Sequence, residues 1–210
     1  MTPPPLIIVI PAYNEEKTVG EVVVKCRMQN VECRTLVIDD GSSDNTAQVA
    51  KQAGAVVLSH PINRGLGAAI ATGIEGALRS LRSTGAPSAS QCVVTLDADL
   101  QHDPAEIPQM VAPIMQGEAD VVIGSRFVTK SRGASDLVTG MPWSRRLANW
   151  CGNVVTWFLF GIWVSDSQSG FRAFSASAAR KLRLRTSTME VSSEIIREIT
   201  RLKLRLVEVP

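Results

Sequence analysis

The stretch Val93-Val94-Thr95-Leu96-Asp97-Ala98-Asp99 passes from a short apolar run into two carboxylates that are separated by one residue. Similar short runs, rich in valine and isoleucine, occupy residues 6–10, 35–38, 56–58 and 121–123. Stretches that fit helices lie between these runs, and the alternation predicts a parallel sheet with helices on both faces. We therefore predict an α/β fold with a Rossmann-like, mostly parallel sheet whose first part is doubly wound.

The connecting stretches carry signals for the start and end of helices. Asn45 and Thr46 can cap a helix that runs towards Gln52 and stops at Gly54. Pro104 opens another helix, which ends near Gly117. Both helices fit the crossover connections that parallel strands require.

Length and composition limit the classes of protein. The chain has 210 residues, of which 45% are hydrophobic, so we expect one domain with a sizeable core. Its net charge of +2 argues against a protein that holds nucleic acid by broad electrostatics. The four cysteines form no Cys-x-x-Cys pair, so neither a zinc site nor a redox motif is predicted. The first apolar run ends at Pro11 and is too short for a secretory signal, so we expect a cytoplasmic protein.

Polar clusters follow four of the predicted strands. They are Tyr13-Asn14-Glu15-Glu16, Asp39-Asp40-Gly41-Ser42, Asn63-Arg64-Gly65 and Asp97-Ala98-Asp99. In an open α/β sheet, ligands bind outside the carboxyl ends of the strands. We therefore expect these clusters to meet at one edge of the sheet and to form a ligand site.

Asp97 and Asp99 are candidate ligands of a divalent cation. In extended backbone, residues two apart point the same way, so both carboxylates can address one spot, and Gln101 could add a neutral oxygen. Mg²⁺ binds through one or two carboxylates and takes its other ligands from water and substrate phosphates. The alternative interpretation is a pair of exposed turn aspartates.

Two further clusters leave alternatives open. Asp39 and Asp40 could accept hydrogen bonds from a base or from ribose hydroxyls, or could belong to a turn in front of a capped helix. The glycines of Asn63-Arg64-Gly65-Leu66-Gly67 suggest a dinucleotide fingerprint, but Ile70 occupies the place of its third small residue. Close backbone approach is the better interpretation of this glycine pair.

The chain changes character after Pro142. An amphipathic helix over residues 143–160 is predicted, with tryptophans on one face and with Arg145 and Arg146 at its start. Such a helix suits a membrane interface with anionic lipid head groups, although the same face could pack under the sheet or form a dimer contact. The apolar run 157–163 is far shorter than the about 20 residues needed to span a bilayer.

Six motifs occur in an order that resembles a known family. They are Pro11-Ala12-Tyr13-Asn14-Glu15, Asp39-Asp40-Gly41-Ser42, Asn63-Arg64-Gly65-Leu66-Gly67, Asp97-Ala98-Asp99-Leu100-Gln101-His102, Gly124-Ser125-Arg126 and Ser169-Gly170-Phe171-Arg172. Together they resemble the inverting family 2 glycosyltransferases of GT-A fold, most of all the dolichyl or polyprenyl phosphate mannosyl- and glucosyltransferases. The resemblance covers essentially the whole chain. Members of the family usually continue past the position of Pro210 into a basic loop over the donor phosphates.

The resemblance implies a reaction and its partners. A hexose, mannose or glucose, would move with inversion from GDP-mannose or UDP-glucose to a polyprenyl or dolichyl phosphate, with Mg²⁺ or Mn²⁺ as the metal. Residues 1–210 would form a single catalytic domain, with a nucleotide-sugar part over 1–125 and an acceptor part over 126–210. The enzyme would sit peripherally on the cytoplasmic face of a membrane, through the helix over 143–160.

The resemblance also implies roles for individual residues. The nucleotide-sugar would be held by Pro11, Ala12, Tyr13, Asn14, Glu15, Asp39, Asp40, Gly41, Asn63, Gly65, Gly67, Asp97 and Ala98. The metal would be held by Asp97, Asp99 and Gln101. Phosphate groups of the donor or the acceptor would face Arg126, Arg145, Arg146, Ser169 and Arg172. The catalytic residues would be Asp99, Arg126 and Asp166, the last as the residue that positions the acceptor or acts as its base.

Other functions are weighed against this one. A lipid monophosphate is already an anionic nucleophile at neutral pH, so no strong base is required, and neither His60 nor His102 is assigned a catalytic role. A glycosyltransferase with another acceptor, such as a cell-wall or polysaccharide sugar, fits the same motifs. A sugar-phosphate nucleotidyltransferase would carry a basic glycine-rich loop after the first strand, where this chain has Asn14-Glu15-Glu16. A non-catalytic binding module is disfavoured by the intact pair of Asp97 and Asp99.

Overall fold

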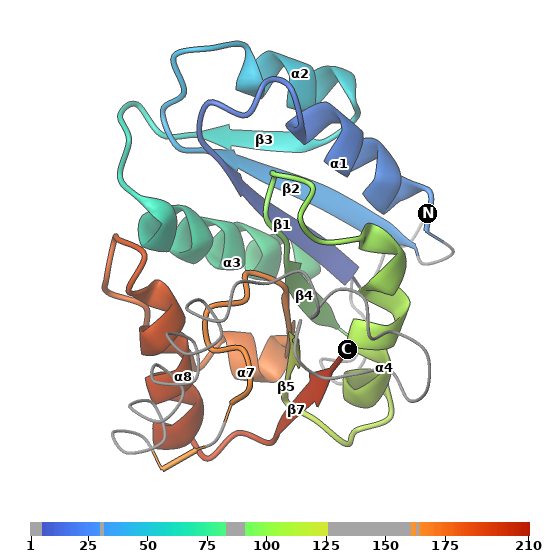
Figure 1. Ribbon diagram of the computed structural model, residues 1–210, viewed down its shortest axis with the longest axis vertical. Coiled ribbons are helices and arrows are strands. Elements are labelled where there is room, and N and C mark those ends of the chain that lie inside the picture. The colour runs from blue at the N-terminus through green and yellow to red at the C-terminus, as the bar shows by residue number, and fades with distance from the viewer. Residues whose placement is uncertain (1–5, 30–31, 83–90, 126–160, 163) are drawn as a thin grey trace, which may run out of the picture.

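The protein is a seven-stranded sheet between two layers of helices (Figure 1). The computed structural model describes residues 6–29, 32–82, 91–125, 161–162 and 164–210. The predictions for Arg126, Arg145, Arg146 and the helix over 143–160 therefore lie outside the described residues.

Strands and helices alternate through the first half of the chain. The strands are β1 (Leu6–Ala12), β2 (Cys33–Asp39), β3 (Val56–Ser59), β4 (Cys92–Thr95), β5 (Val121–Gly124), β6 (Arg172–Ser175) and β7 (Leu206–Val209). The helices are α1 (Val19–Arg27), α2 (Thr46–Gln52), α3 (Leu66–Arg82), the 3-10 helix η2 (Pro104–Glu106), α4 (Ile107–Met115), α7 (Ala176–Ala179) and α8 (Val191–Arg201). All five strands expected from the apolar runs form, and the predicted α/β fold is confirmed.

The order of strands in the sheet is β3-β2-β1-β4-β6-β5-β7. The first four strands of this order are parallel, as the alternation of strands and helices predicts. Strand β6 lies between β4 and β5 and runs antiparallel to both, and the apolar runs indicated neither β6 nor β7. Since β6 pairs with β4, Arg172 lies opposite Thr95, close to the point where the chain reaches Asp97.

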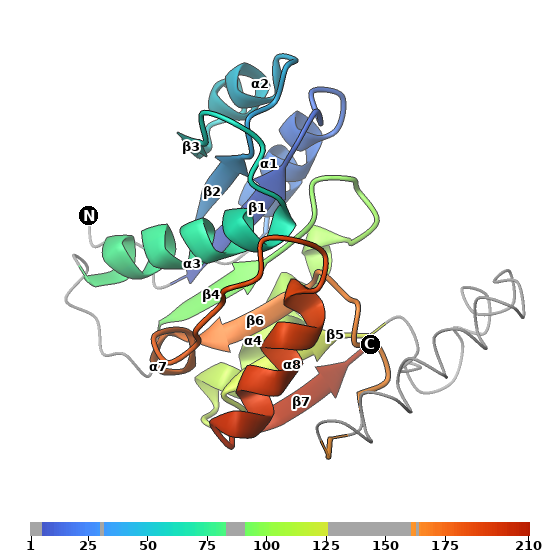
Figure 2. The same ribbon diagram turned by 90° about the vertical axis from the view of Figure 1, so that its left-hand side faces the viewer.

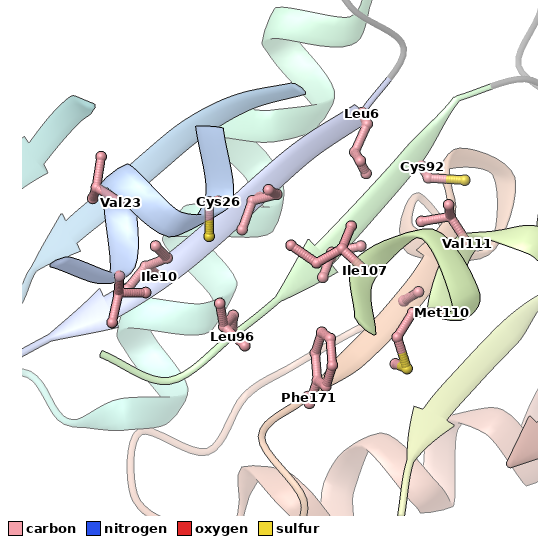
Figure 3. Packing of buried hydrophobic residues seen from close by; sticks show 14 of the residues in the cluster. Leu6, Ile10, Val23, Cys26, Cys92, Leu96, Ile107, Met110, Val111 and Phe171 are labelled. Carbon is pink, nitrogen blue, oxygen red and sulfur yellow. The ribbon is translucent and has the colours of Figure 1, made fainter. Parts of the chain in front are cut away.

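Two apolar clusters hold the layers together, one on each face of the sheet. Leu6, Ile8 and Ile10 of β1 pack with α1 and α4, and Figure 3 shows part of this cluster around Leu96 and Phe171. The alternate β1 residues Ile7 and Val9 pack on the other face with α3, α7 and α8 (Figure 2). Successive side chains of a strand point to opposite faces, so a strand covered on both sides must be apolar throughout.

The described cysteines behave as small apolar residues. Cys26, Cys33 and Cys92 are free thiols, and burial raises the pKa of Cys26 and of Cys92 to about 12. Thiols with pKa values so far above neutrality are poor nucleophiles. No helix in the described part of the chain has the length and apolar character that crossing a bilayer requires.

Two buried glutamates of α8 fasten the segment before it. Glu194 accepts hydrogen bonds from the backbone N–H groups of Arg185 and Thr186, both at 2.9 Å, and Glu198 accepts one from the N–H of Arg183 at 3.1 Å. Burial acts to raise the pKa of Glu194, but the hydrogen bonds from Thr186 and Arg185 outweigh it, so the pKa is lowered. The ionised form of Glu194 thus stabilises the fold.

We predict that Glu194→Ala lowers the free energy of unfolding by about 1–3 kcal/mol at pH 7, because two backbone donors lose their acceptor. The folded-state pKa is lowered, so the contribution of Glu194 is complete above its ordinary value of 4.5 and is lost as the pH falls through the lowered value. Denaturant unfolding at pH 7 and at acid pH measures both effects. The exposed Glu190→Ala is the control, and a loss equal to that control would contradict the prediction.

Candidate active site

A cleft of about 420 Å³ opens at the carboxyl ends of β1, β2 and β4. It is lined by Pro11, Ala12, Tyr13, Glu15, Asp40, Asn63, Gly65, Leu66, Ala69, Ile70, Asp97, Ala98, Asp99, Gln168, Gly170, Arg172, Met189 and Ser192. The predicted meeting of the polar clusters at one sheet edge is therefore found in the structure. The position is the one where open α/β sheets bind ligands.

Asp40 lines the cleft, but its carboxylate oxygens are hydrogen-bonded to other groups of the protein. Its Oδ1 accepts a hydrogen bond from the N–H of Arg64 at 3.0 Å, and its Oδ2 accepts one from the N–H of Gly65 at 2.7 Å. His60 Nδ1 lies 2.6 Å from Oδ1, and His60 Nε2 lies 3.0 Å from Thr72 Oγ1. Asp40 thereby fixes the loop of Asn63 and Gly65 against the cleft, and the buried His60 ties Asp40 to α3.

The glycines of the third motif are required by close packing, as the sequence indicated. A Cβ on Gly65 would overlap the carbonyl oxygen of Ser187, and a Cβ on Gly67 would overlap that of Thr186. Gly65 also has a positive φ of 89°, which favours glycine. The backbone that approaches is the protein's own segment before α8, and Gly67 N donates a hydrogen bond to Ser187 O at 3.0 Å.

Asp97 and Asp99 both line the cleft, but the extended backbone that the sequence analysis predicted for them is wrong. Strand β4 ends at Thr95, and residues 98–99 form a turn, so the two carboxylates are not alternate residues of a strand. The turn continues into Leu100, which has a positive φ of 64°. Asp99 Oδ1 accepts a hydrogen bond from the N–H of Gln101 at 3.0 Å, and Gln101 itself is exposed and does not line the cleft.

Asp97 lies between His102 and Gly170, two residues of the quoted motifs to which the sequence analysis assigned no role. His102 Nε2 lies 3.7 Å from Asp97 Oδ2, and the His102 ring packs on Phe171 with 5.4 Å between ring centroids. Gly170 passes so close to Asp97 that a Cβ there would overlap the carboxylate. The close approach of Gly170 thus fixes where the Asp97 carboxylate can lie.

Arg172 brings a buried positive charge to the cleft. It is 1% exposed, and its Nη2 donates a hydrogen bond to Ser167 O at 3.0 Å, while its Nε has no hydrogen-bond partner. Burial lowers the pKa of Arg172 to about 10, and the charges of Asp97 and Asp166 oppose this shift. The guanidinium is therefore charged at neutral pH, and its Nε is a buried donor without an acceptor among the described residues.

Asp166 and Ser169 lie behind the surface of the cleft. Asp166 is fully buried, does not line the cleft and acts electrostatically on Arg172. Ser169 is also buried, and its Oγ accepts a hydrogen bond from the N–H of Phe171 at 3.2 Å. Asp166 therefore acts on Arg172 through its charge, and Ser169 stabilises the backbone at Phe171, between Gly170 and Arg172.

Three residues of the predicted nucleotide set support the turn after β2. Asp39 Oδ1 accepts a hydrogen bond from Ser42 N at 3.0 Å, and Asn14 Oδ1 accepts one from Ser43 N at 2.9 Å. Gly41 has a φ of 73°, and a Cβ on it would lie 2.5 Å from the carbonyl carbon of Ile62. None of the three lines the cleft.

Several residues of the cleft were missed by sequence reasoning. Gln168, Met189 and Ser192 reach it from the segment before β6 and from the start of α8, and Met189 is 70% exposed. Leu66, Ala69 and Ile70 reach it from the first turns of α3. The quoted motif around Gly170 gave an indirect signal, whereas nothing local in the sequence marks Met189.

The donor set at Asp97 and Asp99 fits a nucleotide-bound Mg²⁺ or Mn²⁺. The described residues contain no cluster of three or more histidine, cysteine, aspartate or glutamate side chains that could enclose a metal. One or two carboxylates that line an open cleft are what Mg²⁺ uses when phosphates and water complete its coordination. Asp97 and Asp99 would be the ligands of such an ion.

Comparison with known sequences decides the family. The family described as Glycosyl transferase family 2 matches residues 7–183. The chain belongs to this family. The fold of this chain is of the GT-A type. This confirms the fold predicted from the resemblance.

Family 2 relatives of this chain include polyprenyl phosphate sugar transferases. A UDP-N-acetylglucosamine--dolichyl-phosphate N-acetylglucosaminyltransferase of Methanococcus voltae is 33% identical, over 98% of this chain and 84% of its own. A polyprenol monophosphomannose synthase of Mycolicibacterium smegmatis is 29% identical, over 85% of this chain and 64% of its own.

A solved structure of similar fold contains a metal. It is the glucosyl-3-phosphoglycerate synthase of Mycobacterium tuberculosis in complex with Mn²⁺, UDP and glucosyl-3-phosphoglycerate. Its sequence is 26% identical to this chain, and the match has a TM-score of 0.64 over 97% of this chain and 68% of that one. Divalent metal is thus used within the structural family.

We predict that Gly170→Ala abolishes the thermal stabilisation that UDP or GDP gives in the presence of Mn²⁺, because the added methyl group displaces the Asp97 carboxylate. The measurement is the melting temperature with and without nucleotide and metal. Gly76→Ala is the matched control, since its methyl group meets only the side-chain ends of Leu36 and Leu58, at 3.1 and 3.2 Å. If UDP or GDP with Mn²⁺ raised the melting temperature of Gly170→Ala as much as that of the unmodified protein, nucleotide binding would not depend on the present position of the Asp97 carboxylate.

Proposed function

We propose that this protein transfers a hexose from a nucleoside diphosphate sugar to a polyprenyl or dolichyl phosphate, with inversion at the sugar. The observation that carries the proposal is a cleft lined by Asp97, Asp99 and Arg172, in which the charge of Asp97 acts on the buried guanidinium. Carboxylates for a metal and a fixed cation for phosphate are the two needs of this reaction. GDP-mannose and UDP-glucose are the proposed donors, and the named activity of one relative adds UDP-N-acetylglucosamine.

One side of the cleft would bind the nucleotide. Tyr13 and Glu15 follow β1, and Asn63 and Gly65 come from the loop that Asp40 holds, so all four reach the cleft from the parallel half of the sheet. Tyr13 is 48% exposed and offers a ring face, while Glu15 and Asn63 offer polar groups to a base or a ribose. The fixed Asn63–Gly65 loop gives these contacts a defined geometry.

The centre of the cleft would serve the departing diphosphate. When bound, a divalent cation supplies charge neutralisation at the leaving-group oxygen. Asp97 and Asp99 would hold that cation, and the positive charge of Arg172, which lines the cleft, would attract a phosphate oxygen. A charge inside the protein is screened much less than one in water, so this guanidinium acts strongly on a nearby anion.

The acceptor phosphate would be the nucleophile. Its second pKa is about 6, so at neutral pH a phosphate monoester is mostly dianionic and needs no general base. A phosphate oxygen forms a bond to the anomeric carbon while the bond from that carbon to the diphosphate breaks. Asp166, fully buried beside Arg172, would then act by holding the guanidinium in place.

The acceptor part and the membrane contact form the second half of the proposal. Arg126, Arg145 and Arg146 would face phosphate groups, and the helix over 143–160 would lie on the cytoplasmic face of a membrane. This peripheral location follows from the lipid acceptor, which is confined to a membrane. The exposed Met189 at the rim of the cleft suits the apolar part of such an acceptor.

The proposal predicts product in one combination of substrates. The protein is incubated with Mg²⁺ or Mn²⁺, polyprenyl phosphate and either GDP-mannose, UDP-glucose or UDP-N-acetylglucosamine, and a charged glycolipid is expected with one of these donors. Parallel tubes contain 3-phosphoglycerate as acceptor, because a solved structure of similar fold holds its glucosyl product. Product only in the 3-phosphoglycerate tubes would show that the acceptor is not the lipid phosphate. No product in any tube would reject the proposed reaction.

A second prediction tests the carboxylate pair. Asp99→Ala is expected to lower kcat by about 10²–10³, as removal of transition-state charge stabilisation does in other enzymes. Metal-dependent stabilisation by UDP or GDP should disappear with it. Glu118→Ala removes an exposed carboxylate outside the cleft and is expected to match the unmodified protein in both measurements. Equal activity of the two variants would exclude Asp99 from the reaction.

A further inference from the structure

One carboxylate oxygen of Glu208 accepts three hydrogen bonds from Ser165 and Asp166. Glu208 lies on β7, and its Oε1 accepts hydrogen bonds from Ser165 N and Ser165 Oγ, both at 2.8 Å, and from Asp166 N at 3.4 Å. Glu208 does not line the cleft. The side chain nevertheless determines where the backbone that carries Asp166 can lie.

The end of β5 joins the same arrangement. Ser125 Oγ lies 2.6 Å from Ser165 Oγ, and Ser125 N donates a hydrogen bond to Val209 O at 2.8 Å. Strands β5 and β7 are parallel neighbours, with Gly124 opposite Val209. Ser125, Ser165 and Glu208 thus tie the ends of two neighbouring strands to the segment of Asp166.

The segment needs these bonds because it is buried but has no regular structure. Val164 and Asp166 are fully buried, and residues 164–167 belong to no helix or strand. Buried backbone N–H groups require acceptors, and outside a helix or a sheet side chains must supply them. A carboxylate forms stronger hydrogen bonds to N–H groups than a neutral acceptor does, so the charge of Glu208 contributes as well as its shape.

The next residues carry this constraint into the cleft. Ser167 O accepts the hydrogen bond from Arg172 Nη2 at 3.0 Å, and the charge of Asp166 favours the protonated form of Arg172. A displaced segment would therefore move both an acceptor and a counter-charge of the guanidinium. Hydrogen bonds thus connect Glu208 to residues 165–166, and Ser167, the next residue, is hydrogen-bonded to Arg172 at the cleft.

We propose that Glu208 is a positioning residue of the active site: it holds residues 165–167 so that Asp166 and Ser167 fix Arg172 at the cleft. The catalytic part of this inference rests on the proposed function. The positional part does not, because it concerns hydrogen bonds within the protein. Strand β7 thereby acquires a role beyond closing the edge of the sheet.

The experiment compares Glu208→Ala, Glu208→Gln and the control Glu118→Gln. For Glu208→Ala, kcat is expected to fall at least about tenfold, and the stabilisation by UDP or GDP with Mn²⁺ is expected to weaken, because Arg172 faces the diphosphate in the proposed function. Glu208→Gln keeps an acceptor oxygen without the charge, so its kcat should lie between those of Glu208→Ala and the unmodified protein. Glu118→Gln should leave all of the measured quantities unchanged.

Hydrogen–deuterium exchange provides a readout that needs no transferase activity. Peptides that cover residues 164–168 are expected to exchange at least about tenfold faster in Glu208→Ala, while peptides from β1 and β4 keep their rates. Faster exchange confined to this segment supports the positional part even if the unmodified protein transfers no sugar to any acceptor tested. In that case the proposed function fails and the positional inference stands.

Three results would overturn the inference. The first is unchanged exchange of residues 164–168 in Glu208→Ala. The second is faster exchange throughout the sheet, which would assign Glu208 to general stability; if Glu208→Ala does not fold, the same criteria apply to Glu208→Gln. The third, in a protein with measured transferase activity, is an unchanged kcat despite faster exchange of the segment.

Discussion

Arg172 keeps a positive charge inside the protein because Asp97 and Asp166 lie beside it. Burying an isolated charge is costly, and the lowered pKa of about 10 reflects that cost, yet the guanidinium remains protonated at neutral pH. The charge lies where β6 pairs with β4, so the pairing of two strands also brings the cation to the carboxylates. The chemistry of the cleft depends on this placement.

The walls of the cleft are held by carboxylates that accept backbone N–H groups. Asp40 holds the loop at Arg64 and Gly65, Glu194 holds Arg185 and Thr186, and Glu208 holds Ser165 and Asp166. The backbone N–H groups that these carboxylates hold lie outside the described helices and strands. Ionised acceptors supply the missing hydrogen bonds, and they fix the loops more strongly than neutral side chains would.

The first half of the fold was accessible from the sequence because its signals are local. The run before Asp97 and the four similar runs each predicted a strand, and the capped stretch at Asn45 predicted the helix that forms. Strand β6 was not accessible in this way. Its four residues begin with a buried arginine, and a charged residue in a central strand contradicts the pattern by which buried strands are recognised.

The sequence by itself determined the α/β class, the edge of the sheet where the polar clusters meet, and the presence of Asp97 and Asp99 at that edge, because short apolar runs and the residues directly after them are local patterns. The tertiary structure alone decided that Asp40 serves the protein's own loop, that Asp166 and Arg172 are buried, and that Met189 reaches the cleft. These facts depend on the antiparallel insertion of β6 and on contacts between segments far apart in the chain. No local pattern encodes such pairings, since they are selected by the packing of the whole sheet.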